Sequence, residues 1–336
     1  MDAPPLGPPG STLTIREVRR SDKDSFSEVM LGSYGPFERM MGLGRSGTAE
    51  FGALFRPGLW YLLRFLRILG LAPIRMYVAA DGGTVVGTTL VLPWPRSGYI
   101  MGVGVRPSHR RRGLAGQLIG RAEQFAGRRG RPWAVLDVEE ENHPAVTLYL
   151  ARQYTTFLRV VWLSCASPRT VASAPRANAA VRAVGKAGRR SAAAWCAPRV
   201  PPVVRETVPP SAQRLTHLES LGQFPGVVRE TWSAGPPDGP TAYLSAAWRG
   251  SDMPGVLFVP AVDPRAPHDD LVRLFQDATA WLSSRGSPTV VVAVPDALAS
   301  TLSVLTELGF EAQMTTLAMS RRLGAPGAPS APPKSP

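Results

Sequence analysis

The stretch that decides the fold is Val-Gly-Val-Arg-Pro-Ser-His-Arg-Arg-Arg-Gly-Leu-Ala-Gly, residues 103–116. A strand-forming segment, 99–105, leads through a turn at Pro107 into this basic loop. An amphipathic helix is expected next, because apolar residues recur about every 3.6 positions. They are Leu114, Leu118, Ile119, Ala122, Phe125 and Ala126. The free N–H groups at the helix start, the close approach that Gly113 allows and the surrounding arginines predict a diphosphate site.

A second block follows at 136–149 and has the order strand, asparagine, helix. It reads Leu-Asp-Val-Glu-Glu-Glu-Asn over 136–142 and His-Pro-Ala-Val-Thr-Leu-Tyr over 143–149. Pro144 suits the first turn of a helix, where its missing N–H costs little. The first block contains neither the Walker Gly-Lys-Ser/Thr nor the dinucleotide-binding Gly-x-Gly-x-x-Gly. Both of those nucleotide-binding loops are therefore excluded.

Together the two blocks resemble the GNAT superfamily of N-acetyltransferases over residues 12–165. The family pattern Val-x-Pro-x-x-Arg/Gln-x-x-Gly-x-Gly/Ala is matched by Val105, Pro107, Arg110, Gly113 and Ala115. The later pattern Leu-x-Val-x-x-x-Asn-x-x-Ala-x-x-Leu-Tyr is matched from Leu136 to Tyr149. Gln153-Tyr154 departs from the Gly-Phe that the family usually has after this helix. The resemblance implies a mixed α/β sheet of the GNAT acyl-CoA N-acyltransferase fold.

The resemblance also implies acetyl-CoA as cosubstrate and assigns most of the site. Val103, Gly104 and Val105 would face the pantetheine and thioester, and Asn142 would lie beside the cofactor arm. The diphosphate would lie on the loop and helix start, formed by Arg110, Arg111, Arg112, Gly113, Leu114, Ala115 and Gly116. The expected reaction is direct acetyl transfer to a primary amine of a small molecule or peptide.

Tyr149 is the expected general acid, at the family's spacing from Asn142. A phenol of pKa about 10 can protonate a thiolate whose conjugate acid has a pKa near 8.5. The structural alternative is a buried aromatic residue on an amphipathic helix. His109 is expected at the surface and His143 in the helix cap. The scattered histidines and cysteines show no metal-ligand spacing, so no metal is expected.

The general base is left open between Asp137, Glu139 and a chain of water molecules. Asp137 is preferred because several family members carry a carboxylate at its position. The alternative is a solvated carboxylate at a strand end. Asp137 and Glu139 form an acidic cluster with Glu140 and Glu141, and this cluster would attract a cationic amine.

The second half resembles a degenerate copy of the first, displaced by about 157 positions. A strand (255–262) and a helix (271–282) are followed by a further strand (289–294) and helix (302–308), as in the first half. The copy lacks the phosphate loop, because Pro267 and Asp270 stand where Arg110 and Gly113 would be. Leu305 replaces the tyrosine. An unrelated α/β domain is the alternative.

These segments predict five regions along the chain. Residues 1–11 and 324–336 are expected to be disordered, because both are rich in Pro, Gly, Ala and Ser. A catalytic GNAT domain spans 12–165, a basic linker 166–204 and the degenerate domain 205–323. The apolar segment 51–74 is too short and too charged to span a membrane. We expect a helix packed over the acceptor side; a dimer surface or an interfacial membrane helix is the alternative.

Composition sets broader limits. The chain has 336 residues, a net charge of +13 and two cysteines, Cys165 and Cys196. With no signal-peptide pattern at the amino terminus and no disulfide framework, the expectation is a cytoplasmic protein. The positive charge is almost entirely arginine, as GC-rich coding produces, so nucleic acid is not the expected partner. A homodimer and a non-catalytic acyl-CoA-binding regulatory protein both stay open.

Overall fold

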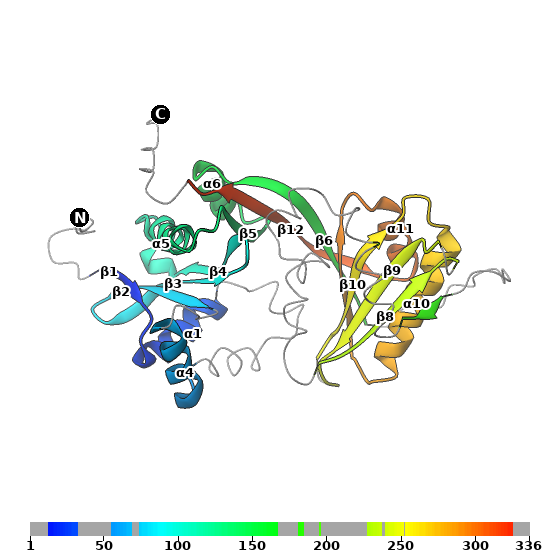
Figure 1. Cartoon of the computed structure of the whole chain (residues 1–336), viewed down its shortest axis with the longest axis horizontal. Coiled ribbons are helices and arrows are strands. Elements are labelled where there is room, and N and C mark those ends of the chain that lie inside the picture. The colour runs from blue at the N-terminus through cyan, green and yellow to red at the C-terminus, as the bar shows by residue number, and fades with distance from the viewer. Residues whose placement is uncertain are drawn as a thin grey trace.

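The computed structural model describes residues 13–32, 55–68, 74–166, 181–184, 195, 227–236, 239–251 and 253–324. The expected tails, most of the expected linker and the ends of segment 51–74 lie outside these residues. The described strands form one twelve-stranded sheet in the order β1-β2-β3-β4-β5-β12-β6-β11-β10-β9-β8-β7. Two groups of helices cover it, one in each half of the chain (Figure 1).

The N-terminal half places helices on both faces of its strands. Figure 1 shows α1 and α4 on one face and α5 and α6 on the other. Its elements are β1 (Thr14–Glu17), α1 (Lys23–Leu31), α4 (Pro57–Ile68), β2 (Arg75–Asp81), β3 (Thr84–Pro93), β4 (Ser97–Val105), α5 (Leu114–Arg128), β5 (Trp133–Glu139), α6 (His143–Ala151) and β6 (Thr155–Cys165). The strands and helices predicted in this half are therefore confirmed, with boundaries that differ by a few residues.

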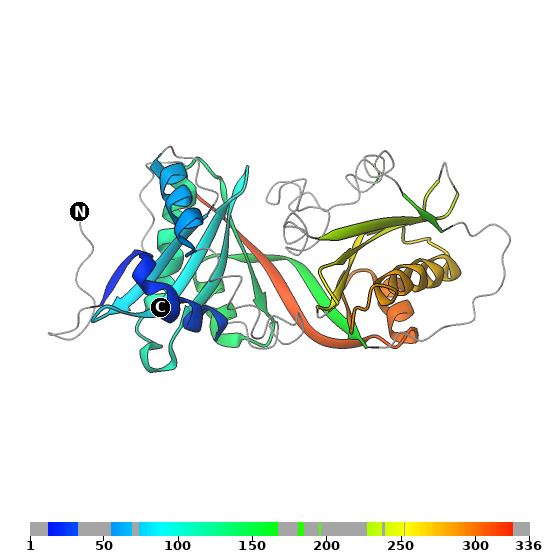
Figure 2. The same cartoon turned by 90° about the horizontal axis from the view of Figure 1, so that it is seen from below.

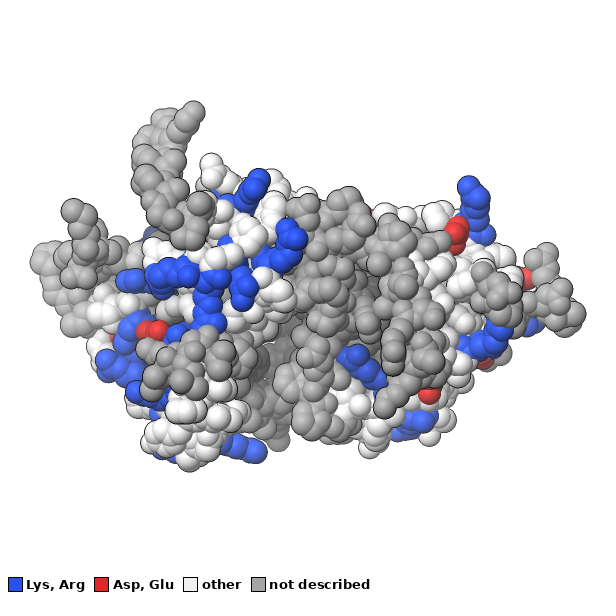
Figure 3. All heavy atoms as spheres, in the orientation of Figure 1, with Lys and Arg blue, Asp and Glu red and all other residues white. Residues whose placement is uncertain are grey.

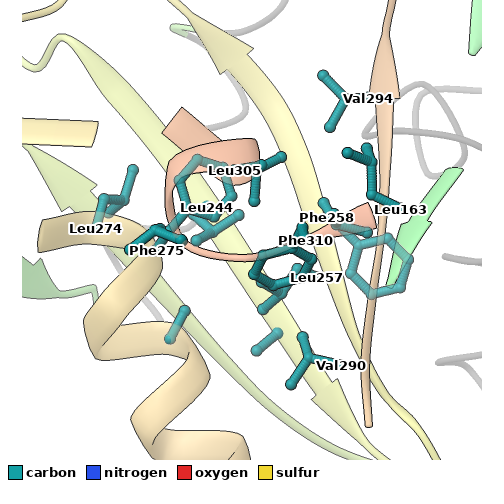
Figure 4. Packing of buried hydrophobic residues seen from close by; sticks show 14 of the residues in the cluster. Leu163, Leu244, Leu257, Phe258, Leu274, Phe275, Val290, Val294, Leu305 and Phe310 are labelled. Carbon is teal, nitrogen blue, oxygen red and sulfur yellow. The ribbon is translucent and has the colours of Figure 1, made fainter. Parts of the chain in front are cut away.

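The C-terminal half repeats the arrangement of strand, helix, strand and helix. Its elements are β7 (Arg182–Ala183), β8 (Val228–Ala234), β9 (Ala242–Trp248), β10 (Gly255–Val262), α10 (His268–Ser283), β11 (Val290–Pro295), α11 (Ala299–Glu307) and β12 (Glu311–Arg322). Its core lies between the sheet and the two helices, where Leu274 and Phe275 of α10 meet Leu244, Leu257 and Leu305 (Figure 4). β7 lies within the expected linker and pairs with β8.

The two halves exchange their last strands. β6 leaves the N-terminal half and pairs antiparallel with β11. β12 returns from the C-terminal half and pairs antiparallel with β5. At the centre, β6 and β12 pair with each other; Figure 2 shows these two long strands crossing between the halves. The sequence boundaries at 165 and 205 stay a prediction, because the strand pairing runs across them.

The pairing register repeats with a shift of 156 positions, which is the difference between Val160 and Thr316. These two residues lie opposite each other, so each strand meets its own counterpart at the centre of the sheet. Under the same shift, the pair Glu139–Thr316 is repeated by Pro295–Val160. This repeated register is the geometry of two related folds joined in tandem around an approximate two-fold axis.

No helix among the described ranges is long and apolar enough to cross a membrane. Within segment 51–74 the structure describes α4, which contacts the body through Trp60, stacked on Phe55 with ring centroids 5.3 Å apart. Both residues are buried with Phe26 of α1. The opposite side of α4 is exposed, with Tyr61 61% accessible. The helix predicted here is confirmed, and its packing face is the face that carries Trp60.

Candidate active site

The site begins where two parallel strands separate. β4 and β5 pair only from Ser97–Ile100 to Trp133–Leu136. Beyond these residues β4 stays with β3 up to Val105, while β5 stays with β12 up to Glu139. From Met101 to Val105, no strand among the described residues therefore pairs with the edge of β4 on the side of β5. Such an edge can hydrogen-bond to an extended ligand between the strands.

A β-bulge at Gly102 marks the same point of β4. The register with β3 shifts between Leu90–Met101 and Thr88–Gly104, and Gly102 has a φ of 62°. The Thr88 hydroxyl donates to the Gly102 carbonyl at 3.0 Å. The bulge adds a residue to the strand, so Ile100 and then Val103 and Val105 all contact the core under α5. β4 bends away from β5 as a result.

The loop before α5 has the geometry of an anion-binding turn. Gly113 precedes the helix with a φ of 72°, and Arg111 also has a left-handed φ, 63°. Arg110 donates from Nε to the Val105 carbonyl at 3.0 Å, which fixes the loop to the end of β4. The first N–H groups of α5 have no acceptor within the helix. Arg111 and Arg112 are exposed beside them, so the loop offers both N–H donors and positive charge.

Tyr149 projects from α6 into the same core. It is 5% accessible and belongs to one apolar cluster with Leu114, Val103 and Val105. Burial raises the pKa of Tyr149 to about 12, so the phenol stays protonated at physiological pH. Its hydroxyl makes no hydrogen bond to the described part of the chain. Within the described residues this side chain therefore holds a proton without an acceptor, in the apolar cluster that also contains Val103 and Val105 of β4.

Asp137 lies on the opposite face of β5. Leu136 and Val138 face α5, and because side chains alternate along a strand, Asp137 faces the side of α1 and α4. The Tyr99 hydroxyl of β4 donates to Asp137 Oδ2 at 2.9 Å. Tyr99 is buried and stacked on Trp94, with centroids 4.6 Å apart. The carboxylate is thus held across the strands at the point where they diverge.

Asn142 and the acidic cluster take part in local contacts. The Asn142 side chain accepts from the Ala145 N–H at 3.3 Å and caps α6. Glu140 is paired with Arg159 at 2.6 Å, and this pairing lowers the pKa of Glu140. Arg159 also reaches Asp296 at 3.4 Å. The hydrogen bond from Tyr99 to Asp137 bridges the two diverging strands.

Several residues of this site were not identified from the sequence. They are Trp94, Tyr99 and Gly102, which shape the gap between the strands, and Thr88, which holds the bulge. A glycine pair, Gly102 and Gly104, inside an apolar strand was the available signal for a bulge. His109 lies in the loop and contacts Asp81 at 3.3 Å. His143 begins α6.

The surface around the loop is positively charged. Figure 3 shows Lys and Arg side chains gathered over the part of the N-terminal half where α5 lies, with few acidic side chains among them. This field favours an anionic ligand. Among the described residues, no group of three or more His, Cys, Asp or Glu side chains could hold a metal ion.

Comparisons with known proteins agree with this geometry. Residues 48–153 match the model of the acetyltransferase (GNAT) family. A mycothiol acetyltransferase from Streptomyces bingchenggensis is 36% identical over 87 residues, which are 25% of this chain and 28% of that protein. The chain thus matches less than a third of the length of this curated relative.

Two solved structures have the same fold along nearly the whole chain. A GCN5-related N-acetyltransferase from Sphaerobacter thermophilus aligns with a TM-score of 0.60 at 13% identity, covering 94% of this chain and 97% of that one. A tandem GNAT protein from the clavulanic acid biosynthesis pathway aligns with a TM-score of 0.53 at 16% identity, covering 95% and 100%. At these identities the similarity establishes the fold.

Proposed function

Because residues 48–153 match the model of the GNAT acetyltransferase family, we propose that this protein transfers an acetyl group from acetyl-CoA to a primary amine of a small molecule or peptide. The observation that carries the proposal is the divergence of β4 from β5 directly beside the start of α5. This arrangement offers an extended strand edge and an anion-binding turn next to each other. Acetyl-CoA has the matching parts, a pantetheine arm and a diphosphate.

The residues present fit this cosubstrate. Residues 111–116 supply backbone N–H groups and two exposed arginines for the diphosphate. The edge at Val103, Gly104 and Val105 has no described strand beside it and can bond the amide groups of the pantetheine; the Val105 carbonyl also accepts from Arg110. The bulge at Gly102 lets a bound arm lie between β4 and β5, where the strands are no longer joined. The Asn142 side chain uses its oxygen in the cap of α6, so its amide nitrogen is proposed as a further donor to this arm.

Tyr149 is proposed to protonate the departing thiolate. It has two properties that a general acid needs: a proton retained at neutral pH and a hydroxyl without a partner in the described protein. The departing thiolate, whose conjugate acid has a pKa near 8.5, is a weaker base than a phenolate. Proton transfer from the phenol to the thiolate is therefore uphill and needs the phenol close to the sulfur. Tyr149 shares an apolar cluster with Val103 and Val105 of β4, and this supports a position near the thioester.

Asp137 is proposed to accept the proton of the amine, from the other side of the gap. Tyr149 and Asp137 lie on opposite faces of β5, so a thioester between the strands would expose one side to each. The amine would enter from the side of α1 and α4, and the thiol would leave toward α6. Acetyl transfer would then be direct, and Tyr99 would orient the carboxylate that acts.

The C-terminal half is proposed to hold no cosubstrate. α10 begins with Asp269 and Asp270 in its first turn, and carboxylates there already complement the positive end of the helix. Asp270 is buried and accepts a hydrogen bond from the Thr241 hydroxyl at 3.4 Å. Leu305 stands in the place of the tyrosine and is buried in the core. We therefore expect one acetyl-CoA per chain.

Calorimetric titration of the full chain with acetyl-CoA tests the cosubstrate site. We expect one molecule per chain, with binding abolished by Gly113→Glu, because the new carboxylate lies where the diphosphate binds. Gly127→Glu is the matched control: it adds the same charge near the other end of α5, where a Cβ meets no atom within 4 Å. Two molecules per chain, or equal losses in both variants, would contradict the assignment.

Release of free coenzyme A thiol from acetyl-CoA, measured with a panel of amines, tests catalysis. The panel comprises spermidine, glucosamine, tyramine and a short peptide with a free amino terminus. Thiol release that depends on an amine and on Asp137 and Tyr149 supports the enzyme. Tight acetyl-CoA binding without amine-dependent release would identify the chain as a non-catalytic acyl-CoA-binding protein.

A further inference from the structure

A buried carboxylate ties the helices of the catalytic half together. Glu123 of α5 is 8% accessible and has three partners. Arg152, directly after α6, binds it at 2.5 Å, and the Tyr154 hydroxyl donates to it at 3.0 Å. Arg321 contacts both of its oxygens, at 3.2 and 3.1 Å. A carboxylate that is this buried requires such compensation, because an unpaired charge in the interior is costly.

The surface of α5 that faces α6 carries two glycines beside Glu123. Gly116, Gly120 and Glu123 lie on one side of the helix, at spacings of four and three residues. A Cβ at Gly120 would lie 3.5 Å from Arg152, and one at Gly116 would lie 3.8 Å from Leu148 of α6. These are ordinary van der Waals distances, so the two glycines mark the face of α5 on which Arg152 and α6 lie. The proposed diphosphate helix and the helix that carries Tyr149 meet at this interface.

The cluster also reaches the tyrosine. Tyr154 packs against Tyr149 with ring centroids 5.9 Å apart, and it is fully buried. Burial, together with the adjacent Glu123 carboxylate, raises the pKa of Tyr154, so its hydroxyl stays a donor to that carboxylate. A contact path thus leads from Glu123 through Tyr154 to the ring of Tyr149.

Arg321 comes from the other half of the chain. It lies on β12, next to β5, where Arg321 pairs with Ala134. Met319 of the same strand is completely buried in the apolar cluster that contains Tyr149. The counterpart of Arg321 under the 156-residue shift is Cys165, which is buried in the apolar core of the C-terminal half. The arginine therefore does not belong to the repeated fold; it occurs only in the half that carries the candidate site.

Resting on the function proposed above, we infer that Arg321 is a positioning residue through which the C-terminal half completes the catalytic half. Arg321 fixes Glu123, and Glu123 holds Arg152 and Tyr154 at the end of α6. This fixes the distance between the start of α5, where acetyl-CoA is held, and Tyr149. The C-terminal half thus serves catalysis without binding cosubstrate, by supplying one strand and one charge.

The test compares Arg321→Met with Arg322→Met in the full chain. Arg322 is the next residue on β12 and is exposed, so its replacement removes an arginine at the same strand end but leaves Glu123 untouched. Acetyl-CoA affinity is measured by calorimetry and turnover by thiol release with the most active amine of the panel. For Arg321→Met we expect kcat to fall about tenfold with acetyl-CoA affinity within about twofold, because the acid is misplaced while the loop stays intact.

Two milder variants keep the test decisive if Arg321→Met does not fold. Arg321→Lys retains the charge but replaces the guanidinium, whose Nη1 contacts both Glu123 oxygens, with a shorter and more strongly hydrated ammonium group, and it should recover part of kcat. Tyr154→Phe removes the hydroxyl contact to Glu123 and keeps the ring beside Tyr149; it should lower kcat as well. If Arg321→Met behaves like Arg322→Met, or if kcat of Tyr154→Phe and Arg321→Lys equals that of the parent, the inference is overturned.

The outcome for the parent protein separates this inference from the proposed function. If the parent binds no acetyl-CoA, the proposed function fails before Arg321 is considered. If the parent binds and turns over while Arg321→Met loses affinity and kcat equally, Arg321 supports folding only, and the positioning role is wrong.

Discussion

Tyr149 and Asp137 are two residues whose proposed roles depend on opposite surroundings. Tyr149 is enclosed by apolar side chains, and this burial raises its pKa to about 12. Asp137 lies on the other face of β5, half-buried, with a phenol donor from Tyr99 at 2.9 Å. One group therefore keeps its proton, and the other is oriented as an acceptor. The proposed proton donor and the proposed proton acceptor therefore lie on the two sides of a single strand.

We predict that Tyr149→Phe lowers kcat about 100-fold and changes acetyl-CoA affinity by less than about twofold. The ring and its packing are kept, and only the proton is lost. In the parent, the rate should not fall through loss of this proton until the pH approaches the Tyr149 pKa of about 12. Equal losses of kcat and affinity, measured by thiol release and calorimetry, would make Tyr149 a packing residue.

Gln153 stands where the family usually has the glycine of its Gly-Phe pair. It follows α6 with a left-handed φ of 65°, while its counterpart Gly309, after α11, has a φ of 87°. The following aromatic residues, Tyr154 and Phe310, are both buried. The turn needs a left-handed residue in both halves, and only the C-terminal half uses glycine.

We predict that Gln153→Gly raises the free energy of unfolding by about 1 kcal/mol, since left-handed backbone costs a side-chain-bearing residue about 1–2 kcal/mol and glycine's greater freedom when unfolded takes part of that back. Gly309→Gln should lower it by a similar amount. Denaturant titration measures both. No gain for Gln153→Gly, with Gln153→Ala as the control that retains a Cβ, would show that the turn is not strained.

Among the elements, β4 determines the geometry of the candidate site, because it pairs with β5 at its start and then diverges from β5. Its first four residues join β5, and a bulge at Gly102 then turns it away. A Cβ on Gly102 would lie 2.2 Å from Cε of Met30 in α1. α1 therefore packs tightly against the bulge, and the opening between the strands depends on a residue without a side chain.

We predict that Gly102→Ala destabilises the fold by about 3 kcal/mol and weakens acetyl-CoA binding, because left-handed strain and overpacking add. Gly83→Ala is the matched control, with a φ of 92° but no atom within 4 Å of its Cβ. It should cost about 1 kcal/mol, from strain alone. Similar unfolding free energies for the two variants would refute the role of Met30 packing.

Across the whole molecule, the exchanged strands make the two halves one cooperative unit. β12 is encoded in the second half but lies between β5 and β6 of the first. Met319 fills the core of the N-terminal half, and Val160 and Trp162 fill that of the C-terminal half. Separating the halves would expose the edges of β5 and β11 together with these apolar side chains.

We predict a single calorimetric transition on heating, with equal calorimetric and van't Hoff enthalpies. Acetyl-CoA should raise the midpoint of that whole transition, because a ligand of the folded state stabilises everything that unfolds with its site. Two separate transitions, with only one shifted by acetyl-CoA, would show that the halves unfold independently despite the exchange.

The sequence by itself determined the local elements and the chemistry of the loop. The spacing of apolar residues in α5 and α10, the Pro-Arg-Gly turn and the Asn142-to-Tyr149 spacing are short-range patterns, and short-range patterns are written in order along the chain. They were sufficient to predict the resemblance to the GNAT family. The place of Asn142 at the start of α6 also follows, since a helix cap is local.

Only the tertiary structure decided which strand lies beside which. Nothing in the sequence of 311–322 shows that β12 lies next to β5 rather than within its own half, because strand pairing between distant segments depends on the register of the whole sheet. The contact of Arg321 with Glu123 follows from that pairing. The bulge at Gly102 depends on the pairing of β3 with β4, and the hydrogen bond from Tyr99 to Asp137 depends on the pairing of β4 with β5. The two side-chain contacts join residues 38 and 198 positions apart, beyond the reach of any local pattern.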